Sequence, residues 1–304
     1  NQTLRKKLTD KLLKKPFDET ENIIRNLLFE LLPTCYLEGF EELLKIVNKQ
    51  PWPKSPRFIF TSNNFGTDEV FKLYTAIKTE NGSKYYIGQH GNHYFTSRYF
   101  FPRIEEQTAD KFFTWGWESS FSKFFPMFIF SNSGRKVDYD KNGGLLLIEE
   151  QLASRTVPWD VYHNYISYFK EQKKFVSKLA NEPMQKLVIR LSRTNEKKKL
   201  SEVKRWREFN RLLSVDRGTT KLNELIAKSR LVVLSYDSTG LLESLSKNIP
   251  TLAFWQNGLD HLRDSVKPDY QRLIDVGILH LSSESAAEKV NKIWNNIDEW
   301  WMQK

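Results

Sequence analysis

The sequence is poor in the residues that build disulfide-linked or metal-linked proteins. It holds one cysteine, Cys35, and five histidines among 304 residues. One cysteine cannot form a disulfide within the chain, and it cannot supply a cysteine-rich zinc module. Because Cys35 lies in the apolar run 31–37, we expect a buried thiol. No HExxH pattern and no Cys/His cluster occur, so we expect no metal site.

Long hydrophobic runs and low-complexity segments are also missing. The densest apolar run, 124–130, contains Pro126 and is far shorter than the ~18 residues that a membrane-spanning helix needs. Residues 1–16 are polar and basic, unlike a signal peptide. The chain does not begin with Met, so we expect a truncated N-terminal domain. With 13 glycines and 11 prolines, it resembles neither a collagen nor a disordered protein.

The residues that are abundant predict a globular protein that binds anions. Hydrophobic residues make up 39% of the chain and aromatic residues 14%, which is enough for a large core. A length of 304 residues favours two domains. Lys and Arg number 47 against 37 Asp and Glu, a net charge of +10. This charge favours nucleic acid, an anionic membrane surface or a phosphorylated substrate, without choosing among them.

The order of hydrophobic segments predicts an α/β protein that starts with helices. Apolar residues recur at about 3.6-residue spacing over residues 1–55, and strands then alternate with helices, as in parallel sheets. We expect an N-terminal domain over 1–139 and a C-terminal domain over 140–304, the last helix of which could cross back. The expected strands are 57–61, 84–88, 111–115, 145–148, 186–191, 213–215, 231–235, 251–255 and 278–281.

The strongest candidate site follows the expected strand 231–235. There, Asp237, Ser238 and Thr239 form a hydroxyl-rich turn before a helix, and Glu243 lies one turn inside it. Helix N-termini and small polar side chains hold phosphate, and a carboxylate can accept hydrogen bonds from a ribose. The plainer interpretation is ordinary N-capping with Glu243 on the surface.

A second candidate site follows the expected strand 186–191. Arg190, Ser192, Arg193 and Thr194 place cations and hydroxyls at the strand end. An arginine fork can grip phosphate or carboxylate in a bidentate manner. The plainer interpretation is a solvated charge.

Two further strand ends carry polar residues in the N-terminal half. His90 lies between Gln89 and Gly91, where glycine lets the backbone approach a ligand and histidine can shuttle a proton. Asn63 and Asn64 follow the strand 57–61 and are weaker candidates for acceptor contacts. His93 is a weaker candidate than His90, and His163, His261 and His280 are expected to be structural or exposed.

A fourth candidate site surrounds the expected strand 111–115. Glu106 and Asp110 precede this strand, and a carboxylate there could act as nucleophile or base. Trp115 and Trp117 follow and could pack against a sugar face. Alternatively, Asp110 caps the chain and the tryptophans belong to the core. No P-loop, GxGxxG or GxSxG motif occurs, which argues against NTPases, Rossmann dehydrogenases and α/β-hydrolases.

Five segments together resemble the transferases encoded in bacterial O-antigen and surface-polysaccharide loci. The resemblance covers roughly residues 57–301. It is carried by GQHGNHY, EEQTADKFFTWGW, RLSRTN, RLVVLSYDSTGLLESLSKNIPTLAFW and GILHLSSESAAEKVNKIWNNIDEWW. It implies a GT-B-like fold, in which two Rossmann-type domains with parallel sheets face each other across a nucleotide-sugar cleft.

The sequence is also distantly similar to capsule-type β-Kdo transferases, which use a CMP-activated ulosonic acid. There, the Asp of an Asp-Gly-Phe motif is implicated as the nucleophile of a retaining double displacement. The nearest counterpart here is Asp110, with Lys111 in place of the glycine. The similarity therefore implies a CMP-linked donor such as Kdo or a nonulosonate, with no metal and no other cofactor. Asp110 would attack the anomeric carbon, and His90 would bind the donor or shuttle a proton.

These observations favour a glycosyltransferase that transfers the sugar to a lipid-linked or oligosaccharide acceptor. We expect it in the cytoplasm, in peripheral contact with the anionic inner face of the membrane. Transfer from a UDP- or GDP-hexose, or from a CDP-polyol phosphate, is the alternative within enzymes. A nucleic-acid-binding protein is disfavoured because acids interleave with the bases and no RNA-recognition signature occurs. The possibility that the protein is an inactive scaffold within an assembly complex also stays open.

Overall fold

The computed structural model divides the chain into two compact units. The described residues are 1–12, 18–94, 96–99, 104–118, 122–132, 134, 138–151, 165–194, 201–255 and 257–303. Residues 1–90 and 104–126 form the first unit, and residues 91–103 and 127–304 form the second. The units therefore separate after residues 90 and 126, not between 139 and 140. The reason lies in hydrogen bonds, since Ser131 bonds to Glu243 and Tyr139 to Asp298, both in the second unit.

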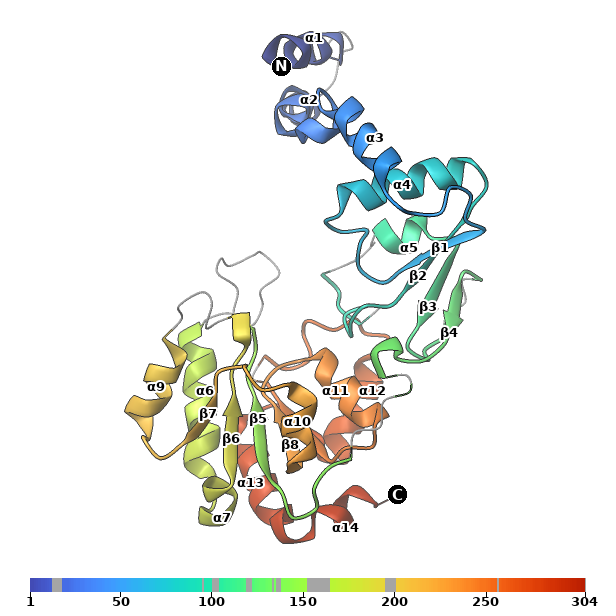
Figure 1. The fold of residues 1–304 in the computed structure, drawn as a ribbon. Helices are drawn as coiled ribbons and strands as arrows, with labels where there is room; N and C mark the ends of the chain where they lie inside the picture. Colours follow the sequence, from blue (N-terminus) through green and yellow to red (C-terminus); the bar gives the residue numbers. More distant parts are fainter. Residues whose placement is uncertain are drawn as a thin grey trace. The chain divides into compact units, whose positions relative to one another are not determined.

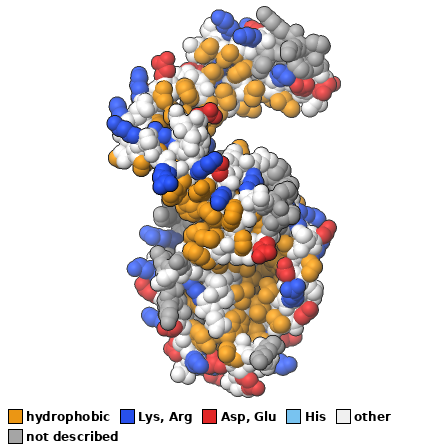
Figure 2. Space-filling model, turned by 90° about the vertical axis from the view of Figure 1, so that its right-hand side faces the viewer, with side chains coloured by type: hydrophobic (Ala, Val, Ile, Leu, Met, Phe, Trp, Pro, Cys, Tyr) orange, Lys and Arg blue, Asp and Glu red, His pale blue; other side chains and the backbone are white. Residues whose placement is uncertain are grey.

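The N-terminal segment is helical, as its periodicity predicts. It holds α1 (Gln2–Leu12), α2 (Glu19–Leu31), a short 3-10 turn (Thr34–Tyr36) and α3 (Phe40–Lys49). No described side chain of α2 is buried, and hydrophobic atoms are visible over these helices in Figure 2. Cys35 is only partly buried, so the prediction of a buried thiol is wrong. It lies in a surface turn that contains no buried residue.

The first unit contains a four-stranded parallel sheet with strand order β1-β2-β3-β4. The strands are β1 (Phe58–Thr61), β2 (Lys84–Gly88), β3 (Lys111–Thr114) and β4 (Phe124–Pro126), with helices α4 (Glu69–Glu80) and α5 (Ile104–Thr108). The first three strands are predicted by the sequence, whereas β4 is not. Pro126 disfavours a strand, but an edge strand tolerates proline because its outer N–H needs no partner.

The second unit contains a six-stranded parallel sheet in the order β10-β9-β8-β5-β6-β7. Figure 1 shows this sheet between two layers of helices. The strands are β5 (Gly144–Ile148), β6 (Leu187–Arg190), β7 (Ser214–Asp216), β8 (Ser229–Leu234), β9 (Thr251–Phe254) and β10 (Leu279–His280). The helices are α6 (Tyr165–Lys178), α7 (Asn181–Gln185), α9 (Glu202–Phe209), α10 (Leu222–Ala227), α11 (Thr239–Ser246), α12 (Lys267–Asp275), α13 (Ser283–Ile293) and α14 (Ile297–Trp301).

The strand order identifies a doubly wound sheet. From β5 the chain moves outward through β6 and β7, and it then returns to β8 on the other side and moves outward through β9 and β10. Counted within this unit, the order is 3-2-1-4-5-6 reversed, the order of dinucleotide-binding Rossmann folds. The prediction of an α/β protein with two parallel sheets is therefore confirmed.

Apolar side chains cover both faces of the central strands. Leu145 and Leu147 pack with α6, α9 and α13, whereas Leu146 and Ile148 pack with α10, α11 and α12. A strand buried on both faces reads as a continuous hydrophobic run, which explains why 145–148 is recognisable in the sequence. Across the described ranges, no helix combines the length and the apolarity that crossing a bilayer requires.

Candidate functional site

The candidate site lies where the strand order of the second sheet reverses, between β5 and β8. β5 ends at Ile148 and is followed by Glu149 and Glu150, and β8 ends at Leu234 and is followed by Ser235. In open parallel sheets the connections leave in opposite directions at such a point, so a crevice opens outside the carboxyl ends of the two strands. The candidate ligand position is therefore defined by topology before any side chain is considered.

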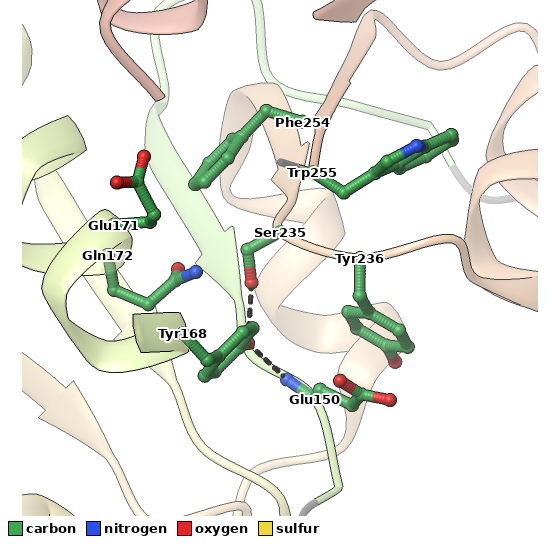
Figure 3. Close-up of a pocket in the computed structure, with 8 residues that line it drawn as sticks. All are labelled: Glu150, Tyr168, Glu171, Gln172, Ser235, Tyr236, Phe254 and Trp255. Carbon is green, nitrogen blue, oxygen red and sulfur yellow. Dashed lines mark hydrogen bonds between the residues drawn. The ribbon is translucent and has the colours of Figure 1, made fainter. Parts of the chain in front are cut away.

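A chain of hydrogen bonds fixes this end of the sheet to α6. The backbone N–H of Glu150 donates to the Tyr168 hydroxyl oxygen at 2.8 Å. The Ser235 hydroxyl donates to the carbonyl of Ile148 at 3.0 Å, so the 2.7 Å contact between Tyr168 and Ser235 is donated by Tyr168. Figure 3 shows Tyr168 between Glu150 and Ser235, with one dashed line to each of them. Burial raises the pKa of Tyr168 well above its usual value, as do the nearby glutamates, so its proton is retained.

A small pocket opens beside this chain of hydrogen bonds. Four aromatic rings and four polar side chains line it (Figure 3). Binding pockets for small molecules commonly have such apolar walls and a few convergent polar groups. The lining residues are Glu150, Tyr168, Glu171, Gln172, Ser235, Tyr236, Phe254 and Trp255.

Tyr236 lines the pocket between an acidic and a basic side chain, Glu150 and Arg190, both of which act on its pKa. Burial raises the pKa of Tyr236, and a hydrogen bond with Ser238 lowers it. The negative charge of Glu150 raises this pKa further, whereas the positive charge of Arg190 lowers it. Arg190 ends β6, which is next but one to β8, so the two strand ends lie about 10 Å apart. The structure thus brings Arg190 and Ser238 to the same edge. Among the described residues, no hydrogen-bond partner reaches the buried Nε of Arg190.

Asp237 was expected to help bind the phosphate of a ligand, but its carboxylate is enclosed by other groups of the protein. The side-chain amide of Asn92 donates to Oδ1 and the Nε2 of His261 contacts Oδ2, both at 2.8 Å. The Tyr270 hydroxyl lies 3.4 Å from Oδ1, and burial together with the charge of Asp237 raises its pKa well above the usual value. The Asp237 side chain is only 1% exposed. Asp237 therefore joins three segments of the second unit.

The N-terminus of α11 lies beside the segment that follows His90. The Ser238 hydroxyl caps the helix by accepting from the N–H of Gly240 at 2.9 Å. The N–H of Asn92 donates to the Thr239 hydroxyl at 3.3 Å. A Cβ on Gly91 would lie 3.1 Å from the same hydroxyl oxygen, so this close approach favours glycine. Within the second unit, Gly91 and Asn92 are thus packed against the N-terminus of α11.

The ribose-binding candidate, Glu243, already has a partner in the protein. Its Oε1 accepts from the Ser131 hydroxyl at 2.7 Å, and its backbone carbonyl accepts from the Asn132 side chain at 3.2 Å. Glu150, which follows β5 directly, lines the pocket instead. The structure therefore offers Glu150 as the carboxylate at the reversal point.

The loop after β6 presents its arginine to solvent. Arg193 is exposed, and the N–H of Thr194 lies 3.3 Å from the Ser192 hydroxyl that accepts from it. Gly218 packs closely against this loop, and a Cβ at this position would lie only 2.4 Å from the backbone N of Arg193. Its φ of +77° is a second reason for glycine.

The carboxyl edge of the first sheet gathers another set of predicted residues. The Gln89 side-chain oxygen accepts from the N–H of Trp115 at 2.9 Å and from the indole N–H of Trp117 at 2.7 Å. His90 follows and is exposed. After β1, the exposed residues Asn63 and Asn64 turn the chain by donating their backbone N–H groups to Thr61.

Asp110 and Glu106 lie at the opposite, amino edge of the first sheet. The Asp110 carboxylate accepts from the backbone N–H of Tyr85 at 2.8 Å and lies 3.3 Å from the Lys84 ammonium. Tyr85 and His90 are five residues apart, so Asp110 and His90 are separated by roughly 16 Å along β2. The two residues therefore do not meet at one reaction centre. Glu106 is buried on α5, and its backbone carbonyl accepts from Lys123.

The sequence analysis did not single out several residues of the second unit. Glu150 follows a predicted strand, so the strand-end argument could have found it. Asn92 lies inside a segment that was selected for its neighbours. Tyr168 and Gln172 lie on α6 one turn apart, a spacing that occurs in every helix and gives no signal by itself.

The fold and this edge are those of an α/β protein with a doubly wound parallel sheet. The model of the LIC12162 family transferases matches residues 1–304, so the chain belongs to that family. No protein with curated annotation matches the chain. Across the described ranges, no three His, Cys, Asp or Glu side chains gather in a way that could hold a metal ion.

Three solved structures are similar to this chain at low identity. A CDPG-soaked variant of the wall teichoic acid polymerase TagF shares 10% identity (TM-score 0.42), with 75% of this chain and 62% of that chain covered. MnaA from S. aureus in complex with UDP shares 10% identity (TM-score 0.48; 90% and 77% covered). The spinosyn rhamnosyltransferase SpnG with spinosyn aglycone also shares 10% identity (TM-score 0.41; 86% and 69% covered). The alignment thus spans less than two thirds of the polymerase chain.

Proposed function

We propose that this protein is a glycosyltransferase that binds a nucleotide-sugar donor at the carboxyl edge of the six-stranded sheet. The observation that carries the proposal is the reversal of strand order between β5 and β8, together with the pocket at that point. Membership in a transferase family supports group transfer as the reaction class.

The donor's anionic groups would lie between Arg190 and the N-terminus of α11. Arg190 supplies a fixed positive charge, and the helix supplies N–H groups next to Ser238 and Thr239. The exposed Arg193 and Thr194 would meet the outer part of the donor. Such groups neutralise a departing phosphate as its charge develops, so we propose that no metal or cofactor is required.

We propose a CMP-linked ulosonic acid as the donor, with a UDP- or GDP-hexose or a CDP-polyol phosphate as equal alternatives. A CMP-linked donor carries one phosphate and one carboxylate, which two arginines, Arg190 and Arg193, can meet. A retaining double displacement needs a carboxylate at the anomeric carbon. Because Asp110 lies at the amino edge of its sheet, we assign it no part in the reaction and give proton transfer to the exposed His90.

The acceptor would use the carboxyl edge of the first sheet. Trp115, Trp117 and Gln89 form a hydrogen-bonded unit there, beside His90 and the two exposed asparagines Asn63 and Asn64. Indole rings pack well against sugar faces, and amides bind hydroxyls. We propose a lipid-linked or oligosaccharide acceptor in the surface-polysaccharide class and a peripheral place on an anionic membrane.

Isothermal titration with CMP, CDP, UDP and GDP tests the nucleotide site. We expect micromolar to millimolar binding of at least one nucleotide, and Arg190→Gln should weaken it at least tenfold, about 1.4 kcal/mol. Arg272→Gln is the matched control, because Arg272 is exposed on α12 of the same unit. Binding of none of the four nucleotides, or equal binding by wild type and Arg190→Gln, would contradict the proposed site.

A further inference from the structure

A larger cavity lies in the first unit, between α4 and α5 and against β2 of the four-stranded sheet. Side chains of these three elements line it, together with the loop after β1 and the residues just before β3. Its volume is about 400 Å³, and sites that bind small molecules commonly span about 300–1,000 Å³. We call this cavity the α4–α5 groove.

The α4–α5 groove runs from the carboxyl edge of the sheet to its amino edge. Phe65 lies in the loop after β1 and Lys72 lies in the first turn of α4, so both are at the carboxyl edge. Thr79 lies near the end of α4 and Asp110 directly precedes β3, so both are at the amino edge. With a rise of about 1.5 Å per residue, the part of α4 that lines the groove is about 10 Å long. The groove therefore admits an extended group.

Two hydroxyls in the lining are bound to their own helices. The Thr79 hydroxyl donates to the carbonyl of Thr75 at 3.0 Å, one turn earlier in α4. The Thr108 hydroxyl donates to the carbonyl of Ile104 at 2.9 Å in α5. A threonine that bonds back to its own helix uses its hydrogen there, so neither hydroxyl offers a hydrogen to a ligand.

The two charged side chains of the lining are paired within the protein. The Lys72 ammonium lies 2.5 Å from the carboxylate of Glu69, which also accepts from the Tyr36 hydroxyl. Asp110 accepts from the backbone N–H of Tyr85 and lies 3.3 Å from the Lys84 ammonium. Both charges of the described lining are therefore compensated, and the groove does not select a charged ligand.

The rest of the described lining is mostly apolar, and part of it is open to solvent. It consists of Phe65, Ala76, Tyr85, Ile104 and Ala109. Ile104 is 66% exposed and Ala76 is exposed as well. Contiguous exposed apolar surface of this kind often marks a ligand-binding groove, because covering it removes apolar area from water.

The α4–α5 groove begins beside residues that the proposed function assigns to the acceptor. Phe65 directly follows Asn63 and Asn64 in the loop after β1. Both asparagines are exposed at the carboxyl edge of the sheet. An acceptor whose sugar reaches these amides can therefore extend its next group past Phe65 into the groove.

We infer that the α4–α5 groove holds the hydrocarbon chain of a lipid-linked acceptor whose sugar lies at Asn63 and Asn64. This inference rests on the proposed function and narrows its acceptor to one that carries a lipid. A hydrocarbon chain is extended, apolar and uncharged, as the groove requires. A further sugar would instead bring hydroxyls that need partners, and the polar groups of the described lining already have theirs.

Isothermal titration with octyl β-glucoside and methyl β-glucoside, both below the micelle concentration of the former, tests the inference. The two probes share their sugar and differ only in the chain, so wild type should bind the octyl glucoside at least tenfold more tightly. Ala76→Trp fills the groove from an exposed position and should abolish this preference while leaving the melting temperature unchanged. Ile104→Gln should weaken the octyl glucoside several-fold. Ala227→Trp, at an exposed position of α10, is the matched control and should behave as wild type.

The outcomes separate this inference from the proposed function. Equal binding of the two glucosides by wild type overturns the inference. So does an undiminished preference in Ala76→Trp and Ile104→Gln, because the chain would then bind elsewhere. In either case the proposed function stands if a nucleotide binds and loses affinity in Arg190→Gln. If no nucleotide binds, the proposed function fails, and a preference that Ala76→Trp abolishes would show only a lipid site.

Discussion

Replacing Asp237 by alanine should strongly destabilise the second unit. The carboxylate accepts at 2.8 Å from the Asn92 amide and contacts the His261 imidazole at 2.8 Å. Asn92, His261 and Asp237 are all at least 95% buried. Removing the carboxylate takes the acceptor of these two 2.8 Å contacts away from groups that water does not reach. A buried polar group that loses its partner costs about 1–3 kcal/mol, so Asp237→Ala should cost about 2–5 kcal/mol.

Urea unfolding followed by circular dichroism would measure the change in free energy of unfolding. Asp237→Asn should cost less, because it keeps one carbonyl oxygen for Asn92 while its amide faces His261. Asp269→Ala is the control, since Asp269 is 67% exposed and its ion pair with Arg272 should contribute at most about 1 kcal/mol. A loss below about 1 kcal/mol for Asp237→Ala would show that Asp237 does not hold these segments together.

Two further changes test other parts of the second unit. Burial, reinforced by the charge of Glu202, raises the pKa of Glu149 well above its usual value. Above about pH 4.3 the unfolded chain loses this proton while the folded chain keeps it, so the stability of the folded state should fall as the pH rises. Glu149→Gln should remove that fall, measured as the melting temperature between pH 5 and 8. Parallel curves of melting temperature against pH for wild type and Glu149→Gln would refute this reasoning. Gly218→Ala should cost about 2–3 kcal/mol in urea unfolding, because its φ is +77° and its Cβ would meet Arg193, whereas Gly82→Ala, with a φ of +93° and open space, should cost less; equal losses would contradict the steric argument.

The strands and their ends could be predicted because local patterns encode them. The run 145–148 forms β5, and 231–235 largely coincides with β8, because both are apolar on every side and bounded by polar residues. Strand β4 was not predicted, because its proline is acceptable only in an edge strand. Whether a strand lies at an edge depends on the whole sheet and cannot be recognised from the local sequence. The turn that contains Cys35 looked apolar but lies at the surface.

The candidate site could be predicted only in part. Arg190 and Ser238 each follow a strand, but only the sheet order shows that their strands are next but one to each other. Asp110 also adjoins a strand, yet it lies at its amino end, where the polarity of a parallel sheet points away from His90. Gln172 gives no sequence signal, because only the packed structure places it in the lining of the pocket.

Hydrophobic periodicity and turn chemistry act over a few residues, and they determined that this chain forms parallel α/β sheets preceded by helices. Which strand lies beside which, and therefore which side chains share an edge, depends on contacts between residues far apart in the sequence, such as Leu145 of β5 and Leu231 of β8. Asn92 and Asp237 are such a pair, separated by 145 positions. Only the tertiary structure decided that Asp237 is enclosed by protein groups while Gln172 faces the pocket, because burial and hydrogen bonding are set by the complete packing of the chain.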